Sequence, residues 1–238
     1  MERLKENGRA TVEDLAGFLY VSPATVRRDL SAMQKLGMLK RTHGGAIHVD
    51  NGEEVSIFVR MESDSEEKEE AATIAAKHIP EFNTVFIDNS STCFALADKI
   101  DFTYKTVVTN GIQLAQKLGN KKNVEVILLG GSLRYKSNAT NGAFARSMLE
   151  QFRFDLMLLG AAAIREDGSY ESSLDTVEIK KTAFERSDKH ILIVGKRKFD
   201  LKALYRVAPL PNFDLICTNA RDPFIKEWAS KGIKIVNQ

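Results

Sequence analysis

The sequence contains little cysteine and no long hydrophobic segment. Its 238 residues include two cysteines, Cys93 and Cys217, and neither has the neighbours of a disulfide framework or a zinc site, so both are predicted to be small core residues. No apolar run approaches the roughly 20 residues that span a bilayer, and the charged start MERLKENGR precedes no secretion signal. We therefore expect a cytoplasmic protein without a membrane partner, a metal or another cofactor.

The charged residues are unevenly distributed along the chain. Residues 1–49 carry eight lysines and arginines against five acids, whereas residues 50–70 carry nine acids against two bases. A long charged stretch buries too little apolar surface to join a core. We therefore predict a basic head (1–49), an acidic linker that becomes the start of a helix capped by Ser65 (50–70) and a large second domain (71–238).

Two short amphipathic helices are predicted in the head. Thr11 is placed to cap a helix over residues 12–19, and Ser22 and Pro23 are typical of the start of a second helix, which Gly37 would end. The apolar positions of one face are Val12, Leu15, Ala16 and Leu19 in the first helix and Val26, Leu30, Met33 and Leu36 in the second. The outward face of the second helix carries Ala24, Arg27, Arg28, Ser31 and Lys35.

This outward face has the composition of a DNA-recognition helix, with two arginines and no acid. The following segment LKRTHGGAIHV is typical of a hairpin with a Gly-Gly turn and a basic wing. A solvated, non-functional surface helix is the alternative, but the succession of helix, turn, helix and basic hairpin favours contact with double-stranded DNA. The predicted DNA-binding residues are Ser22, Ala24, Thr25, Arg27, Arg28, Ser31, Lys35, Lys40, Arg41 and His43. The acids of the linker are interpreted as a solvated face rather than as a device that keeps the second domain off DNA.

The second domain repeats one pattern, in which a short apolar run ends in glycine or small polar residues and precedes a helical stretch. The runs are TVFIDNSST, TVVTNG, VEVILLGGS, LMLLGAA, KHILIVGK and DLICTNA. This alternation predicts a mostly parallel α/β sheet that is covered on both faces. Because parallel strands end on one edge, these residues are expected to line a common crevice: Asp88, Asn89, Ser90, Ser91, Thr92, Thr109, Asn110, Gly130, Gly131, Gly160 and Gly195.

The first of these strand ends is the strongest candidate for an anion site. Asp88 to Thr92 form a hydroxyl-rich loop at the expected start of a helix, where unpaired N–H groups favour phosphate. A purely structural role as a helix cap is about equally common for such loops. Lys180 and Lys198 are candidates for the opposing positive charge.

The head motifs VSPATVRRDL and RTHGG resemble the recognition helix and wing of the DeoR family of bacterial transcriptional regulators. The rest of the chain resembles the DeoR C-terminal sensor domain, through the loop Asp88–Thr92, the steps VTN and LGG, Gly142, the pair Glu178 and Lys180, and Lys198-Phe199. The resemblance implies a fold similar to ribose-5-phosphate isomerase and glucosamine-6-phosphate deaminase. It also implies a phosphorylated sugar as effector, to which Glu178 would contribute, and a homo-oligomer, either dimer or tetramer.

Two segments depart from the family pattern. Residues 193–199 read IVGKRKF where the family commonly has LADSSKF, and Asn219 stands where the family has an acid. The altered loop would favour a more highly charged ligand or would no longer bind the usual one.

Three functions remain open at this stage. The first is a sugar-phosphate-responsive repressor of a carbohydrate operon, and the second is an isomerase or deaminase with Asp88, Asp175 or Glu178 as proton-transfer base. The third is a DNA-binding protein whose sensor has lost its ligand. The basic recognition helix favours the first over an enzyme, because an isomerase needs no such helix.

Overall fold

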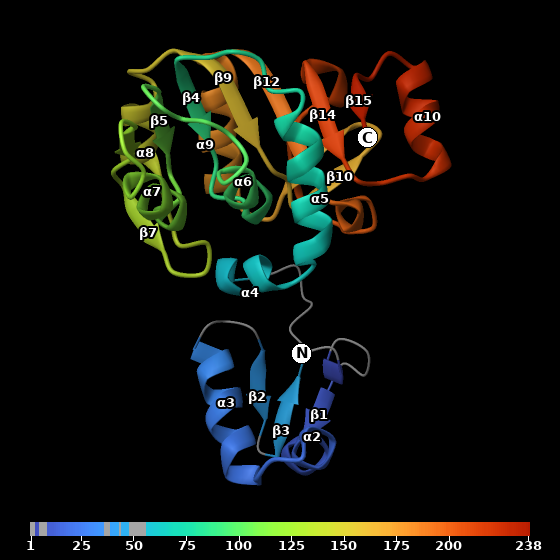
Figure 1. Cartoon of the computed structure of the whole chain (residues 1–238). Coiled ribbons are helices and arrows are strands. Elements are labelled where there is room, and N and C mark those ends of the chain that lie inside the picture. The colour runs from blue at the N-terminus through green and yellow to red at the C-terminus, as the bar shows by residue number, and fades with distance from the viewer. Residues whose placement is uncertain (1–2, 5–8, 36–38, 43, 48–55) are drawn as a thin grey trace.

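The computed structural model describes residues 3–4, 9–35, 39–42, 44–47 and 56–238. The head contains β1 (Arg9–Thr11), α2 (Val12–Leu19), α3 (Pro23–Lys35), β2 (Lys40–Thr42) and β3 (Gly45–Ile47) (Figure 1). The three strands form an antiparallel sheet in the order β1-β3-β2. The predicted helix, turn, helix and hairpin are confirmed, and β1 is an addition that hydrophobic periodicity did not indicate.

Capping and packing follow the predicted pattern in both helices of the head. Thr11 Oγ1 accepts a hydrogen bond from Asp14 N at 3.0 Å, and Ser22 Oγ accepts one from Thr25 N at 3.1 Å. The prediction that Leu19 shares the buried face is wrong, because α2 ends there and its side chain is 55% exposed. The buried positions are Val12, Leu15, Ala16, Val26 and Leu30. The predicted positions Leu36 and Gly37 lie outside the described residues.

Gly45 has a different role from the predicted turn residue. Thr42 pairs with Gly45, so Gly45 is the first residue of β3 and not part of the turn. A Cβ atom at Gly45 would lie 2.1 Å from the backbone oxygen of Ala10 in β1. Glycine is therefore required here because a neighbouring strand approaches closely.

Gly45→Ala is expected to destabilise the head by about 1–3 kcal/mol, because β1 has to move away from β3. Gly44→Ala is the matched control, since nothing lies within 4 Å of a Cβ at that position. Thermal unfolding followed by circular dichroism compares the two variants. Equal melting temperatures would contradict the assignment of Gly45 to strand packing.

The segment expected as a linker is mostly helical in the part that the structure describes, residues 56–70. It forms α4 (Ile57–Glu62) and the beginning of α5 (Ser65–Ala76). The N-cap of α5 is Asp64 in a left-handed conformation, whereas Ser65, the predicted cap, is the first helical residue. Both helices pack on the α/β domain, so residues 56–70 are structurally part of that domain.

The α/β domain is built on a seven-stranded parallel sheet. The strands are β4 (Thr84–Ile87), β5 (Thr106–Thr109), β6 (Glu125–Leu128), β9 (Phe154–Leu159), β12 (Ser187–Val194), β14 (Leu215–Thr218) and β15 (Ile235–Val236), in the order β15-β14-β12-β9-β4-β5-β6. All six predicted strands are present, and β15 extends the sheet at one edge. The chain runs outward from β4 through β5 to β6, returns to β9 on the other side of β4, and continues outward. The carboxyl ends of β4 and β9 therefore form a topological switch point, where ligands bind in such folds.

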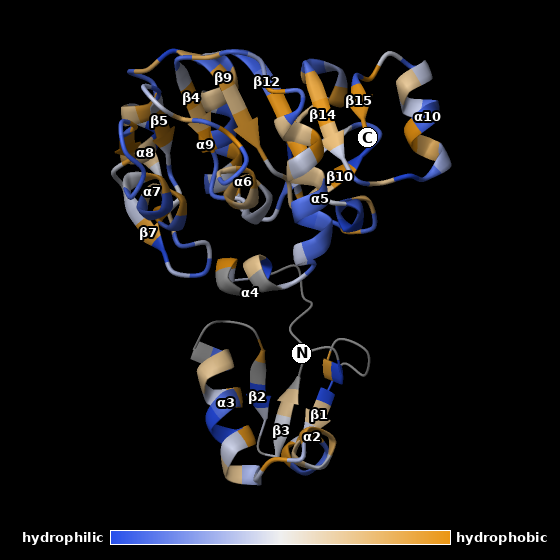
Figure 2. Cartoon of the chain, viewed as in Figure 1, coloured by the Kyte–Doolittle hydropathy of each residue, from blue (hydrophilic) through white to orange (hydrophobic). Residues whose placement is uncertain are grey.

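Helices cover both faces of the sheet (Figure 1). The cluster under α5, α6 (Ser91–Leu96) and α7 (Ile112–Gly119) includes Val85 and Ile87, whereas the cluster under α8 (Ala143–Leu149), α9 (Leu174–Glu185) and α10 (Pro223–Ser230) includes Phe86. This alternation is that of a strand buried on both sides. Figure 2 shows α5 changing from hydrophilic first turns to apolar later turns, which pack on the sheet. None of the described helices is both long and apolar enough to cross a membrane.

Two small antiparallel sheets extend from the domain. One is the hairpin of β7 (Ser132–Arg134) and β8 (Ala139–Asn141), and the other has the order β10-β11-β13, from β10 (Ala163–Arg165), β11 (Gly168–Glu171) and β13 (Tyr205–Ala208). The 3₁₀ helices η1 (Lys196–Phe199) and η2 (Leu210–Asn212) follow β12 and β13. The β7–β8 hairpin, α4 and η1 all lie near the carboxyl ends of the central strands.

Candidate DNA interface and effector site

The outward face of α3 presents its two arginines to solvent. The side chain of Arg28 is 80% exposed and that of Arg27 is 55% exposed. Each lies 3.7 Å from one carboxylate, Glu13 for Arg27 and Asp29 for Arg28, which is too long for a good hydrogen bond. Exposed ion pairs of this kind contribute about 0–1 kcal/mol, so the guanidinium groups can exchange these contacts for phosphates or bases.

Other predicted DNA-binding residues hold the wing against the recognition helix. Arg41 on β2 donates from its guanidinium to Ser31 Oγ at 2.7 Å, and its backbone N–H donates to Gln34 Oε1 at 2.9 Å. Ser31 in turn donates to the Arg27 carbonyl at 2.6 Å. Ala24 is exposed at the start of α3. The side chains of Lys35 and Lys40, and all of His43, lie outside the described residues.

At the switch point in the α/β domain, a buried lysine joins the ends of two strands. The ammonium group of Lys180, on α9, donates to Asp88 Oδ2 at 2.8 Å, to Glu171 Oε1 at 2.5 Å and to the Gly160 carbonyl at 2.8 Å. The second Asp88 oxygen accepts the backbone N–H of Ser90 at 3.0 Å. Because an ammonium group has three donors, Lys180 has none left for an effector.

Both charges of this buried pair are stabilised. Burial by itself raises the pKa of Asp88, but the charge and hydrogen bonds of Lys180 and the hydrogen bonds of Ser90 bring it below its usual range. Burial acts to lower the pKa of Lys180, and the charges of Asp88 and Glu171 outweigh it and raise that pKa. The arrangement is therefore a closed ion pair, in contrast to the half-ionised carboxylate that serves as a general base.

The predicted polar loops do meet at the carboxyl edge, and most of their groups are engaged there. Ser90 Oγ caps α6 by accepting the N–H of Cys93, and Thr109 Oγ1 accepts the N–H of Gly111. The Asn89 amide donates to the carbonyl of Ser137 at 3.3 Å. Ser91 and Thr92 are buried, Gly130 and Gly131 are exposed, and Asn110 has a buried Oδ1 with no hydrogen-bond partner among the described residues.

The two carboxylates of the enzyme hypothesis that lie on α9 are paired with arginines of other elements. Asp175 pairs with Arg134 of β7, and Glu178 lies 3.6 Å from Arg146 of α8. The structure thus does not bring Glu178 together with Lys180, although they are two residues apart. The described residues contain no group of three His, Cys, Asp or Glu side chains that could hold a metal ion.

Four basic side chains, including that of Lys198, lie near one another, and the sequence did not predict this grouping. We call Arg60, Lys68, Arg197 and Lys198 the cation cluster. Burial, followed by the charges of Arg60 and Arg197 among its neighbours, lowers the pKa of Lys198 to about 8. Burial also lowers the pKa of Lys68 to about 8, and its ammonium donates to the carbonyls of Arg60 and Ser63. The signal in the sequence that could have indicated this cluster was the presence of two isolated bases, Arg60 and Lys68, in an acidic segment.

Acids of α5 and its cap bind the loops that follow β12 and β14. Asp64 forms an ion pair with Arg197 at 2.8 Å, and Glu67 accepts the backbone N–H of Arg197 at 3.3 Å. Glu70 accepts from Asn219 and from Arg221, both at 3.0 Å. The interpretation of these acids as a solvated face is therefore wrong, because they stabilise the positive loop that departs from the family pattern.

Helix α4 covers the polar crevice at the carboxyl ends of the strands. Ile57 is 3% exposed, and its N–H donates to the Lys136 carbonyl in the β7–β8 loop at 2.7 Å. The space between α4 and the strand ends is about 10 Å³, which is hardly enough for one water molecule. It is lined by Ile57, Met61, Asn89, Ser90, Phe94, Gly111, Gln113, Leu114, Ser137 and Asn138. A sugar could enter only if α4 moved.

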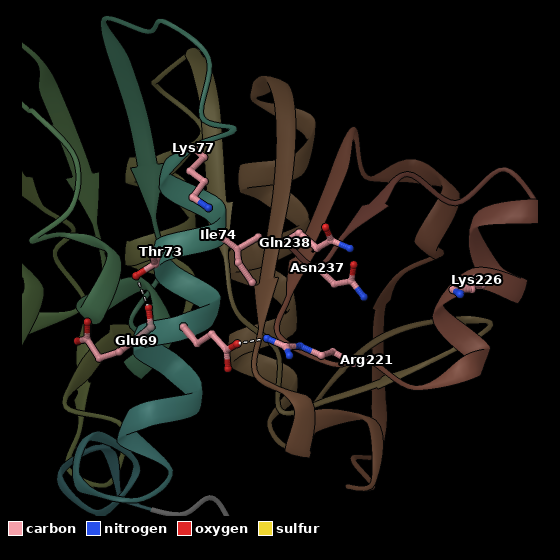
Figure 3. A pocket seen from close by; sticks show the side chains of 9 residues that line it. Glu69, Thr73, Ile74, Lys77, Arg221, Lys226, Asn237 and Gln238 are labelled. Atoms are coloured by element: carbon pink, nitrogen blue, oxygen red, sulfur yellow. Dashed lines mark hydrogen bonds and ion pairs between the residues drawn. The ribbon is translucent and has the colours of Figure 1, made fainter.

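A larger open groove lies elsewhere, between α5 and the β15 edge of the sheet (Figure 3). Its volume is about 810 Å³, and the ion pair between Glu70 and Arg221 crosses its wall. None of the predicted effector residues is among the described residues that line it. Size alone therefore does not identify the sensing site.

Comparison with known proteins gives one consistent result. The DeoR-like helix-turn-helix domain matches residues 1–51 and the DeoR C terminal sensor domain matches residues 63–220. The chain is 32% identical to the HTH-type transcriptional regulator GolR of Listeria innocua, over 91% of this chain and 86% of that protein. It is 32% identical to the glycerol-3-phosphate regulon repressor of Escherichia coli, over 94% and 89%, and 30% identical to the repressor GlcR of Bacillus subtilis, over 92% and 85%.

Solved structures are similar to this chain at lower identity. The translation initiation factor eIF-2B of Pyrococcus horikoshii has a TM-score of 0.45 at 17% identity, covering 65% of this chain and 62% of that one. Ribose 5 phosphate isomerase A of Neisseria gonorrhoeae has a TM-score of 0.39 at 17% identity, covering 56% and 52%. The expected likeness to glucosamine-6-phosphate deaminase stays a prediction.

Proposed function

This chain belongs to the DeoR family and is a DNA-binding transcriptional regulator rather than an enzyme, and from that premise we propose that it is a repressor released from its operator by a phosphorylated sugar. The observation that carries the proposal is the exposed arginine pair of α3, in the domain that matches the family's helix-turn-helix. One of the named relatives is a glycerol-3-phosphate regulon repressor, which supports a phosphorylated effector.

The cation cluster is our proposed seat for the phosphate group. It gathers cations from α4, α5 and η1, and α4 also faces the polar loops of β4 and β5, whose amide and hydroxyl groups suit a sugar. Lys180 and Lys198 are the two lysines predicted to supply the positive charge opposite the phosphate. Lys198 fits this role, whereas Lys180 is engaged in its ion pair. Asp88 then acts by holding the loop rather than by binding the ligand.

Coupling to DNA is proposed to run through α4. This helix covers the crevice and directly follows the segment that joins it to the head. Effector binding can release DNA only if the effector has different affinities for the two arrangements. A ligand that needs α4 displaced satisfies that condition, because it binds the displaced arrangement alone.

The proposal includes a homo-oligomer, since one recognition helix reads one half-site. Large apolar side chains lie exposed on and around the β7–β8 hairpin, which supports self-association: Leu133, Tyr135, Phe144 and Leu174. The mass of the protein in solution, measured by light scattering, tests this part directly.

A panel of sugar phosphates, tested for release of the protein from DNA upstream of its own gene, tests the effector proposal. At least one member should release the DNA and raise the melting temperature of the protein. If none does either, the sensor has lost its ligand, an outcome that the substitution of Gly195 and Arg197 for the family's acid and hydroxyl supports. Turnover of any member would instead support the isomerase or deaminase alternative.

The affinity for an active effector is expected to fall roughly tenfold between pH 7 and pH 9. Lys68 and Lys198 each have a pKa of about 8, and a bound phosphate dianion raises both values, so binding takes up protons and weakens as pH rises. Isothermal titration at several pH values measures the effect. Lys68→Arg and Lys198→Arg keep the charge and should flatten the profile. A wild-type affinity independent of pH would exclude the cation cluster as the phosphate seat.

A further inference from the structure

One residue of the head adopts a backbone conformation that its side chain disfavours. Tyr20, which ends α2, has φ 55° and ψ 38°, the left-handed region in which glycine or asparagine is usual. Its backbone N–H donates to the carbonyl of Ala16, as in a normal helix end. Glycine at this position would make the same hydrogen bond without steric strain.

The side chain of Tyr20 does not offset this backbone strain by stabilising contacts in the head. It is 95% exposed and makes no hydrogen bond or ring contact with any described residue. Its neighbours Phe18, Leu19 and Val21 are also exposed, by 53%, 55% and 39%. Four successive large apolar residues on the surface, one of them strained, indicate a role outside the stability of the domain.

The position of Tyr20 indicates what it contacts. Tyr20 precedes Ser22, the cap of α3. It therefore lies at the N-terminal end of the recognition helix, where the first backbone N–H groups point out of the helix. No acid occurs between Leu15 and Arg28, and the guanidinium of Arg3 lies 4.3 Å from the centre of the Phe18 ring. The segment that carries Tyr20 therefore has no negative side chain, which suits the phosphate backbone of DNA better than it suits another copy of the head.

We propose that Tyr20 contacts the DNA backbone next to the bases that α3 reads, with its hydroxyl donating to a phosphate oxygen and its ring packing on the deoxyribose. Tyrosine is among the side chains that make such contacts, which position a protein on the duplex without reading sequence. This inference rests on the DNA-binding function of the chain. It adds a positioning residue that lies in the turn, outside both the recognition helix and the wing.

The chain contains a matched control for this proposal. Tyr104, in the loop before β5, has φ 61° and is 82% exposed, so it shares the backbone strain and the exposure of Tyr20 but lies in the α/β domain. Tyr20→Gly and Tyr104→Gly should both raise the melting temperature of the domain that they occupy, by about 4 °C in the small head. Only Tyr20→Gly should weaken DNA binding.

The experiment measures binding of the full chain to the duplex upstream of its own gene and to a random duplex, by fluorescence anisotropy. Tyr20→Gly should weaken both by about tenfold, since a backbone contact is independent of sequence, and Tyr20→Phe should show part of that loss. The slope of log affinity against log salt should not change, because a neutral hydroxyl displaces no counterion. A Tyr20→Gly variant that is more stable and binds both duplexes like wild type would overturn the proposal. A loss of self-association, measured by sedimentation, would also overturn the proposal if each head kept its affinity for DNA. If wild type itself bound neither duplex, the regulatory function would fail instead.

Discussion

Replacing Lys180 with methionine is expected to lower the free energy of unfolding of the α/β domain by about 3–5 kcal/mol. Its side chain is 3% exposed, and its ammonium group compensates the buried Asp88 carboxylate and that of Glu171. Methionine fills the volume but leaves Asp88 charged and nearly without solvent. Urea unfolding, followed by the circular dichroism of the parallel sheet, measures the loss.

Lys231→Met is the matched control for that variant. Lys231 also contacts two carboxylates, Glu166 at 2.5 Å and Glu227 at 2.7 Å, but its side chain is 45% exposed. Exposed pairs contribute little, so this control should lose far less stability than Lys180→Met. Equal losses in the two variants would show that burial of the Lys180 pair does not matter.

The pH dependence of the Lys180→Met variant follows from the same pair. In wild type the lowered pKa of Asp88 contributes stability that is present above the ordinary carboxylate pKa and is lost as pH falls through the lowered value. Without Lys180, burial dominates and raises that pKa. The folded variant then binds a proton more readily than the unfolded chain, so its deficit relative to wild type should shrink as pH falls from 7 towards 5.

The strands and the location of the site could be predicted from the sequence for a simple physical reason. A strand buried on both faces is a continuous apolar run, and a run ending in small polar residues marks a strand end, as IDNSST does after β4. In a parallel sheet all such ends meet. The two-residue β15 was missed because its pattern is too short to be distinguished from a loop.

The role of each polar residue could not be predicted in the same way. Asp88, Glu171 and Lys180 come from three different elements, and only the fold reveals that one ammonium group binds both carboxylates. Arg60 and Lys68 were placed in a linker because the acids around them dominate the local charge. Whether an acidic segment is solvated or packed depends on the positive loop it meets, here around Arg197, which lies more than a hundred residues away in sequence.

The double variant Arg27→Ala/Arg28→Ala is expected to weaken binding to operator DNA about 100-fold at 0.1 M salt, since a charged contact to a base or phosphate contributes about 1–3 kcal/mol. Both side chains are exposed, and their 3.7 Å contacts with Glu13 and Asp29 are weak. The double substitution should therefore lower the affinity for DNA without lowering the stability of the head.

The salt dependence of that variant distinguishes the two kinds of contact. If an arginine binds a phosphate, its removal should reduce the slope of log affinity against log salt by about 0.9, whereas removal of an arginine that binds a base should lower the preference for the operator over random DNA. Lys122→Ala/Lys234→Ala, which removes two exposed charges from the α/β domain, should leave both quantities nearly unchanged. If the arginine variant and this control bound DNA equally well, the face of α3 would not be the reading surface. Equal losses of affinity in the two variants, each of which removes two positive charges, would instead indicate that net charge accounts for the affinity of this chain for DNA.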